Sequence, residues 1–409
     1  MKRYDQYKNT GIEWIGNIPN YWEYTRLKYL SYIKTGYTPS KDEKENYCDD
    51  GIVWAKPDNL NEYLPVNESK ERISEVGLKQ QNIIPKGSVL VCCIGSIGKF
   101  GIAGCDLVTN QQINSIVFNQ RIAPCFGKYL IGASVNEHDR NANGNVVKIL
   151  NTENQKQISF PIPPSSEQTT IADYLDRKTA MIDQLIEDKK RLIELYEEEK
   201  AAVINQAVTK GLDPCVPMKD SGIEWLGEIP EHWEVMKLKN LASLKSGNNI
   251  VSEQIKETGD YPVFGGNGLR GYFNDFTHEG NYILIGRQGA YCGNIKYTSG
   301  KFWASEHAVI LTSLSKYEMV YLGELLRAMN LNQYSVSAAQ PGLAVEAIKN
   351  LKIPFPSYKE QSVIVKFIET ECTRIEVKKA NAQRLIDLLT EYRTALISEV
   401  VTGKIKVTD

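Results

Sequence analysis

Few residues of this chain could do chemistry, and the first set has the order of a nuclease motif. Pro57-Asp58 precedes Glu68-Ser69-Lys70, and in such a motif two acids would hold Mg²⁺ for phosphodiester cleavage. The second half of the chain has no counterpart, and a charged sequence produces this pattern easily by chance. We therefore interpret the segment as a solvated loop. A stand-alone nuclease using Asp58, Glu68 and Lys70 would require Mg²⁺-dependent cleavage by the isolated chain.

A second candidate is "GNGLRG", Gly266 to Gly271, which matches the glycine fingerprint of dinucleotide-binding folds. That fingerprint needs a helix directly after the glycines, because the helix N-terminus holds the pyrophosphate. The continuation "YFNDFTHEG" is not helical, and no strand-helix-strand unit surrounds it. We expect a turn-rich loop here and no nucleotide cofactor.

Metal and methyl-transfer chemistry find no support either. The eight cysteines include no C-x-x-C pair and the four histidines are scattered, which favours reduced thiols and no zinc site. The chain has no N-P-P-Y or D-P-P-Y stretch of the kind with which adenine methyltransferases hold a flipped base. The sequence predicts no catalytic residue, and no metal or cofactor bound by this chain.

Two glycine-rich segments suit recognition better. "CIGSIGKFG" (93–101) and "LIGRQGAYCGN" (284–294) each leave an apolar run and carry a cation, Lys99 or Arg287. Backbone amides in such turns can approach a phosphate, and Arg287 or Gln288 could reach a base edge. The alternative is that these are tight turns needed only for folding.

Polar side chains end two further runs. They are Asn110, Gln111, Gln112 and Asn114 in "TNQQINS", and Ser305, Glu306 and His307 in "ASEHA". Asn and Gln suit adenine, although polar residues are common at strand ends.

The elements that would position these loops form mixed α/β domains. "SVLVCCIG", "NYILIG", "SIVF" and "AVILT" are short apolar runs that predict strands, and "GKYLIGAS" and "MVYLGELLRAM" predict short helices.

The chain is a tandem duplication. "TGIEWIGNIPNYWEYTRLKYL" (10–30) returns as "SGIEWLGEIPEHWEVMKLKNL" (221–241), and the segment from Ile158 to Thr209 matches that from Leu351 to Thr402. Each half therefore has fixed ends and a variable middle.

The matching end segments predict two long helices. Apolar residues recur at steps of four and three, with charged residues between them; they are Ile171, Leu175, Ile182, Leu185, Leu192, Tyr196 and Val203 in the first helix, and Ile364, Ile368, Ile375, Leu385, Leu389 and Leu396 in the second. About 40 helical residues span on the order of 60 Å. A second helix packed on the first must run back toward the first domain, so the pair is antiparallel.

The expected architecture is a mixed α/β (α+β) fold with two similar globular domains separated by two long antiparallel helices, a pseudo-twofold tandem duplication. We assign residues 1–164 to the first recognition domain, 165–211 to the first helix, 212–356 to the second recognition domain and 357–409 to the second helix.

Length, composition and net charge limit the number of domains, the location and the partners of the protein. A chain of 409 residues fits two domains. It lacks both the long apolar run of a membrane span and the apolar segment of a secretory signal, so we expect a cytoplasmic protein that binds no membrane. The net charge of −2 counts against nucleic acid as a partner, unless a local basic face or a basic partner subunit supplies the positive charge.

Taken together, the layout resembles the specificity subunit of type I restriction-modification systems over essentially the whole chain. The segments that carry the resemblance are "SGIEWLGEIPEHWEVMKLKNL", "YPVFGGNGLRGYF", "YILIGRQGAYCGN", "PIPPSSEQTTIADYLDRKTAMIDQLI" and "LLTEYRTALISEVVTGKI".

The resemblance implies a non-catalytic protein whose two target recognition domains each read one half of a bipartite site in double-stranded DNA. The helices would set the gap and dock two copies of the modification subunit, an adenine-N6 methyltransferase. S-adenosylmethionine, Mg²⁺ and ATP would belong to partner subunits, and the resemblance leaves open whether a restriction subunit with translocase and nuclease activity joins them.

By that resemblance we assign DNA contacts to Ser96, Lys99, Asn110, Gln111 and Gln112 in the first domain and to Asn267, Arg270, Arg287, Gln288 and His307 in the second. We assign methyltransferase contacts to Glu199, Lys200, Tyr392 and Arg393, which as an alternative are solvated helix positions.

A rival interpretation is a scaffold without DNA, a coiled coil that presents two protein-binding domains. In either case the repeated tryptophan phrase should not read DNA, because it is common to two domains expected to read different sequences. We expect it to pack each domain against the helices through Trp14, Ile18, Pro19 and Trp22, and through Trp225, Ile229, Pro230 and Trp233.

Overall fold

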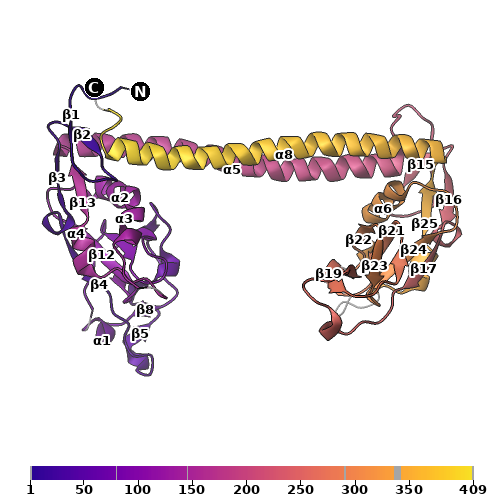
Figure 1. Ribbon diagram of the computed structural model, residues 1–409, viewed down its shortest axis with the longest axis horizontal. Coiled ribbons are helices and arrows are strands. Elements are labelled where there is room, and N and C mark those ends of the chain that lie inside the picture. The colour runs from indigo at the N-terminus through magenta and orange to yellow at the C-terminus, as the bar shows by residue number, and fades with distance from the viewer. Residues whose placement is uncertain (1, 80, 145, 290–291, 336–341, 408–409) are drawn as a thin grey trace. The chain divides into compact units, whose positions relative to one another are not determined.

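The computed structural model describes residues 2–79, 81–144, 146–289, 292–335 and 342–407 (Figure 1). Its contacts divide the chain into two units. The first unit comprises Met1–Lys189 with Arg384–Asp409, and the second comprises Lys190–Gln383. Each unit therefore contains one globular domain and parts of both long helices.

The first unit has two main sheets. The larger has the order β4-β12-β9-β10-β7, with bounds Ser31–Thr35, Ile113–Phe118, Val89–Cys92, Phe100–Ala103 and Pro65–Val66. The smaller has the order β11-β6-β8-β5, with bounds Val108–Thr109, Ile52–Ala55, Arg72–Ile73 and Tyr47–Cys48. Strands β6 and β11 run parallel, whereas β4, β12, β9 and β10 pair antiparallel.

The second unit repeats this arrangement. One sheet has the order β17-β24-β21-β22, with bounds Ala242–Ser246, Ala308–Ser313, Tyr282–Gly286 and Ile295–Thr298. The other has the order β19-β18-β23-β20, with bounds Gly268–Phe273, Tyr261–Gly265, Lys301–Ala304 and His278–Glu279. Strands β18 and β23 are the parallel pair.

Shorter elements complete each unit. The first unit contains β1 (Tyr7–Asn9), β2 (Asn17–Pro19), β3 (Glu23–Arg26), β13 (Ser159–Ile162), α1 (Glu75–Leu78), α2 (Pro124–Ala133), α3 (Val135–Arg140) and α4 (Thr152–Gln157). The second contains β14 (Met218–Asp220), β15 (Glu228–Pro230), β16 (Glu234–Lys237), β25 (Lys352–Phe355), α6 (Met319–Ala328) and α7 (Val345–Lys349). The strands predicted from the four apolar runs are β9, β12, β21 and β24, and the two predicted short helices are α2 and α6.

The expectation of a turn-rich loop at Gly266–Gly271 is wrong. Only Gly266 and Asn267 form the turn, and the next residues begin β19, which pairs with β18 from Gly265 opposite Gly268. A two-residue connection is the commonest link between antiparallel strands. The second glycine of the fingerprint, Gly268, has φ +103°, a backbone conformation that favours glycine directly after the turn.

The two long helices are α5 (Ser165–Lys210) and α8 (Tyr358–Val401). Within the second unit, Glu197 pairs with Lys379, and Lys200, further along α5, pairs with Glu376, which lies earlier in α8. This reversed order confirms the antiparallel pairing there. In the first unit the same helices share a core of Ile171, Leu175, Ile182, Leu396, Ile397 and Val400.

Two residues that were predicted to lie in the apolar seam between the helices are exposed instead. Leu185 and Leu385 are 47% and 46% exposed. From the buried Ile182 the seam advances four residues to Ile186, which packs on the core. From Ala382 it advances four residues to the buried Ile386. The predicted positions Leu185 and Leu385 each lie one residue too early, because an α-helix has 3.6 residues per turn and the inward face falls on Ile186 and Ile386.

The repeated tryptophan phrase packs on the helices, as expected. Trp22 and Trp233 are fully buried. The Nε1 group of Trp22 donates to Glu167 Oε2 in α5 at 3.0 Å, and that of Trp233 donates to Glu360 Oε1 in α8 at 2.9 Å. Each domain is therefore fastened to the first turns of a long helix by a partly buried, charge-assisted hydrogen bond.

Candidate nucleic-acid interface

In each unit, the loops that follow two parallel strands meet the loop that follows a strand of the other sheet, β9 or β21. Strands β6 and β11 pair with Ala55 opposite Thr109, and β18 and β23 pair with Phe264 opposite Ala304. The carboxyl ends of parallel strands lie at one edge, where open α/β sheets bind ligands. We call the following segments the end loops: 56–59, 93–99 and 110–112 in the first unit, and 266–267, 287–289 with 292–294, and 305–307 in the second.

Matching backbone hydrogen bonds hold the end loops in both units. Cys93 N donates to Gln112 O at 2.7 Å, and Arg287 N donates to His307 O at 2.9 Å. Cys93 O in turn accepts from Leu150 N, as Arg287 O accepts from Leu343 N. Cys93 and Arg287 are therefore structural counterparts, as are Gln112 and His307.

A glycine in each unit allows the neighbouring strand to approach these loops. A Cβ atom on Gly36 would lie 2.1 Å from Thr109 O, and one on Gly247 would lie 2.2 Å from Ala304 O. No side chain fits at such distances from a backbone carbonyl. The two glycines therefore keep β4 and β17 close to the last residues of β11 and β23.

The end loops of the second unit enclose an open hollow of about 520 Å³. Its lining consists of Gly266, Asn267, Arg270, Gln288, Gly289, His307 and Gly342. The fold thus brings together four of the five residues that the sequence assigned to DNA in this domain. Arg270, Gln288 and Asn267 are exposed, and Asn267 Oδ1 accepts a hydrogen bond from Asn294 Nδ2 at 3.3 Å.

Arg287, the fifth assigned residue, is placed differently. Its Nη1 group donates to Ser246 Oγ at 3.1 Å, and the residue is only partly exposed. It does not line the hollow. The guanidinium holds strand β17 beside the hollow. Its other N–H groups can donate to a second partner.

The assigned residues of the first unit divide into exposed and buried ones. Ser96, Lys99 and Gln111 are exposed, and Lys99 Nζ donates to Pro57 O at 2.7 Å. Asn110 is only 6% exposed, and its Nδ2 group donates to Gln112 Oε1 at 3.0 Å. Asn110 therefore positions Gln112 in this structure.

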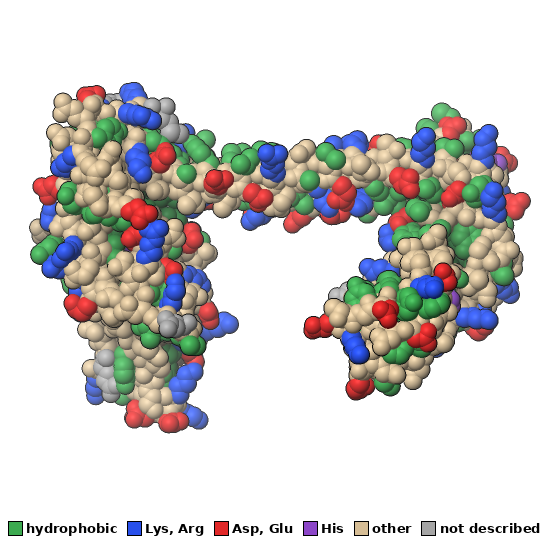
Figure 2. Space-filling view, viewed as in Figure 1, with side chains coloured by type: hydrophobic (Ala, Val, Ile, Leu, Met, Phe, Trp, Pro, Cys, Tyr) green, Lys and Arg blue, Asp and Glu red, His purple; other side chains and the backbone are tan. Residues whose placement is uncertain are grey.

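Charge alone does not mark these loops as a basic patch. Lys and Arg lie among Asp and Glu on the face of each unit that Figure 2 shows. His307 Nε2 lies 3.0 Å from Glu306 Oε1, which places a carboxylate beside the hollow of the second unit. Burial raises the pKa of the Cys93 thiol to about 12, so this thiol stays neutral and unreactive.

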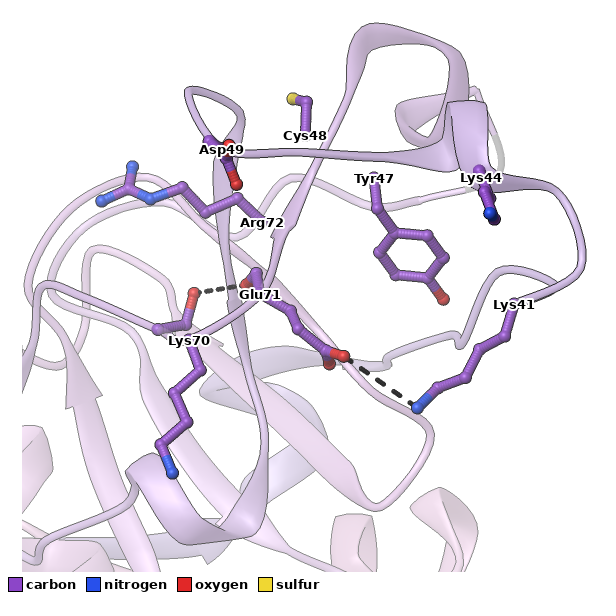
Figure 3. A pocket seen from close by; sticks show the side chains of 9 residues that line it. Lys41, Lys44, Tyr47, Cys48, Asp49, Lys70, Glu71 and Arg72 are labelled. Atoms are coloured by element: carbon purple, nitrogen blue, oxygen red, sulfur yellow. Dashed lines mark hydrogen bonds and ion pairs between the residues drawn. The ribbon is translucent and has the colours of Figure 1, made fainter.

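The first unit has a hollow of its own, about 420 Å³ in volume, at β5 and β8 (Figure 3). Four cations line it, Lys41, Lys44, Lys70 and Arg72, together with Asp49 and Glu71. The Lys44, Lys70 and Arg72 side chains point in different directions (Figure 3), so they do not converge on one small anion. The run "SKDEKEN" before β5 supplies Lys41 and Lys44, but its three acids outnumber its two lysines, so it carries no sequence signal for a basic surface.

Three of the four residues assigned to the methyltransferase are engaged between the helices. Lys200 Nζ lies 2.6 Å from Glu376 Oε1, Glu199 Oε1 lies 2.7 Å from Arg374 Nη2, and Arg393 Nε lies 2.8 Å from Asp183 Oδ1. Tyr392 is 45% exposed. Other apolar residues of the two helices are exposed too, among them Met181, Leu185, Leu385 and Leu388.

The described residues hold no group of three or more His, Cys, Asp or Glu side chains suited to a metal ion. Asp58 and Glu68 therefore do not belong to such a cluster. None of the helices in the described parts of the chain has the length and apolar character needed to cross a bilayer.

Two polar residues at the end loops were not assigned from the sequence. Glu306 Oε2 is buried and has no hydrogen-bond partner among the described residues. Asp58 is exposed in the loop that follows β6. Glu306 stood in the polar run "ASEHA", whereas nothing local connected Asp58 with the other loops.

Comparisons with known proteins agree with this arrangement. The model of the type I restriction modification DNA specificity domain matches residues 19–195 and 230–385. The EcoprrI specificity subunit of a type I restriction enzyme from Escherichia coli is 28% identical over 90% of this chain and 94% of its own length.

Two solved structures share the fold. A chain from a study of the complex assembly and conformational transition of the type I system superposes with a TM-score of 0.66 at 15% identity, covering 95% of this chain and 99% of that one. The HsdS subunit from Thermoanaerobacter tengcongensis gives 0.58 at 14% identity, over 95% and 98% of the two chains. With the family model matched once in each half, the chain belongs to the type I restriction modification DNA specificity domain family.

Proposed function

We propose that this chain is the DNA-recognition subunit of a type I restriction-modification complex. Each globular domain reads one half of a bipartite duplex site, and the paired helices set the gap between the half-sites. The observation that carries the proposal is the same three-loop arrangement in both units, since one fold used twice suits a target read in two parts.

The end loops supply the groups that DNA recognition needs. Lys99 and Arg270 are exposed cations suited to phosphates, and Gln111, Gln288 and Asn267 are exposed amides suited to base edges. Ser96, Gln112, Arg287 and His307 complete the proposed contact surface, with Asn110 holding Gln112 in place. The mixed surface charge fits a subunit that shares the duplex with more basic partners.

The helices are the proposed docking surface for two modification subunits. Tyr392 and the exposed Met181, Leu185, Leu385 and Leu388 offer apolar contact area. Glu199, Lys200 and Arg393 sit in interhelical ion pairs, so their proposed contribution to docking is to hold the helix surface in shape. S-adenosylmethionine, Mg²⁺ and ATP are proposed to be bound by the partner subunits, and a restriction subunit is a further proposed partner.

A scaffold that binds proteins instead of DNA is not favoured, because the curated relative is named as the specificity subunit of a restriction enzyme. The same name supports a role without catalysis for this chain.

The deciding experiment is a genome-wide map of N6-methyladenine in the host with and without the gene for this chain. We expect one split motif to lose its methylation on deletion and to regain it when the gene is restored. If every methylated motif survives the deletion while the methyltransferase subunit is still produced, the proposal is wrong.

A further inference from the structure

The sequence left one motif without a role, the acidic residue at Pro57-Asp58. We propose that Asp58 is a specificity-determining residue of the first domain, which accepts a hydrogen bond from a base amino group. This inference rests on the proposed function, DNA recognition by the end loops.

The first argument is the register of the parallel strands. Ala55 lies opposite Thr109 in the first unit, and Phe264 lies opposite Ala304 in the second. Asn110 N donates to Ala55 O at 3.0 Å, and Ser305 N donates to Phe264 O at 2.9 Å. Ala55 and Phe264 are therefore counterparts in the two units.

Asp58 lies three residues after Ala55, and Asn267 lies three residues after Phe264. Asn267 lines the hollow of the second unit and is one of the residues assigned to DNA. Asp58 therefore lies in the loop of the first unit that corresponds to the loop of Asn267, although the first is a 3-10 turn over Pro57–Asn59 and the second is a hairpin turn.

The second argument is that both segments are tied to the same neighbouring loop. In the first unit Lys99 Nζ donates to Pro57 O at 2.7 Å, and in the second Asn294 Nδ2 contacts Asn267 Oδ1 at 3.3 Å. Lys99 and Asn294 are themselves counterparts, because Lys99 O accepts from Cys92 N and Asn294 O accepts from Gly286 N.

The third argument is the state of the Asp58 side chain. It is exposed, and it takes part in no hydrogen bond or ion pair within the described structure. The nearby Lys56 does not neutralise it, because the Lys56 ammonium pairs with Glu71 and lies 4.2 Å from the Trp54 ring centroid. Asp58 therefore offers both carboxylate oxygens to a partner.

The chemistry of a carboxylate decides what that partner is. A carboxylate only accepts hydrogen bonds, and in the major groove the only amino donors are cytosine N4 and adenine N6. Phosphates and the keto oxygens of guanine and thymine repel it. Asp58 therefore selects cytosine or adenine on the strand that it faces, whereas the amide of Asn267 can both donate and accept.

The test uses the complex with its methyltransferase subunits and duplexes in which each base pair of the methylated split motif is changed in turn. The variants are Asp58→Ala, Asp58→Asn, the reciprocal Asn267→Asp, and Glu153→Gln as a control. Glu153 is another exposed acid of the first unit, in α4, and its Oε1 atom lies 2.7 Å from Lys156 Nζ.

We expect Asp58→Ala to lose about 10- to 100-fold discrimination at one base pair of one half-site and to leave the other half-site unchanged. Asp58→Asn should alter the preference at that same base pair, and Asn267→Asp should change one base pair of the other half-site. Glu153→Gln should match the unaltered complex.

Two results would overturn the inference while leaving the proposed function intact. One is discrimination within about twofold of the unaltered complex at every base pair for Asp58→Ala. The other is a uniform rise in affinity for all duplexes, which would mean that Asp58 acts only through its charge. If the unaltered complex itself prefers no split motif, the proposed function fails instead.

Discussion

Lys200 Nζ lies 2.6 Å from Glu376 Oε1 across the helix pair, and the duplicated chain repeats this contact in its other unit. There Arg393 Nε lies 2.8 Å from Asp183 Oδ1. Since Lys200 aligns with Arg393 and Asp183 aligns with Glu376 in the repeat, the two ion pairs are one interaction made twice.

The Lys200 to Glu376 contact gives the first prediction. The two side chains remain 30% and 49% exposed, and exposed ion pairs contribute little to stability. Lys200→Met should therefore lower the midpoint of thermal unfolding by no more than about 2 °C, measured by circular dichroism. It should keep the methyltransferase subunit bound in co-purification, with Lys366→Met, at another exposed lysine of the helices, as the control. Loss of that subunit at an unchanged midpoint would show that Lys200 contacts it directly.

The second prediction concerns Trp22. Trp22→Phe keeps an aromatic ring in the core but removes the donor to Glu167, leaving that carboxylate with Tyr4 and Tyr21 as its partners. The free energy of unfolding of the first unit should fall by about 1 to 3 kcal/mol, measured by urea titration.

The control for Trp22 is Trp303→Phe in the second unit. Its indole Nε1 makes a longer hydrogen bond of 3.4 Å to Asn248 O in an exposed setting. Loss of this bond should therefore lower the free energy of unfolding by less than Trp22→Phe does. Equal effects of the two substitutions would contradict a special role for the bond to the helix.

The third prediction is a loss of stability at acid pH through His138. This residue is fully buried in α3, where Nδ1 lies 2.9 Å from Ser134 O and Nε2 has no partner within the described structure. Burial lowers the pKa of His138 from 6.5 to about 4.

Between these two pH values the unfolded chain binds a proton that the folded chain does not. Stability should therefore fall as the pH drops from about 6.5 to about 4, by up to about 3 kcal/mol, and be unaffected by this residue above pH 7. His138→Asn should remove that pH dependence in urea titrations, whereas the exposed His232→Asn should keep it. An unchanged slope in His138→Asn would assign the acid sensitivity to other groups.

The fourth prediction tests whether Arg287 contacts DNA bases or only supports the domain structure through Ser246. Arg287→Ala should relax discrimination in one half-site only, at a cost of about 1 to 3 kcal/mol at the affected base pair, measured by binding to substituted duplexes. Arg270→Ala, at an exposed cation, should instead weaken binding to all sequences and lower the salt dependence. If Arg287→Ala weakens both half-sites equally, its bond to Ser246 Oγ is structural and the residue does not read DNA.

Much of the fold could be predicted from the sequence because its signals are local or repeated. The duplicated phrase, the apolar runs of β9 and β21 and the long periodic segments of α5 and α8 each carry their own pattern. The burial of Trp22 and Trp233 also followed from the sequence, because a phrase common to two domains with different targets has to serve their shared structure.

Contacts between distant segments were decided by the tertiary structure alone. Arg287 turns to Ser246, the backbone amide of Asn110 donates to Ala55 O, and Asp58 joins the end loops through the bond from Lys99 to Pro57 O. Each of these contacts joins residues far apart in the chain, and no local sequence pattern encodes it. The sequence by itself determined that there are two like domains on two long helices, whereas only the packing of the strands decided which side chains stand together at their ends.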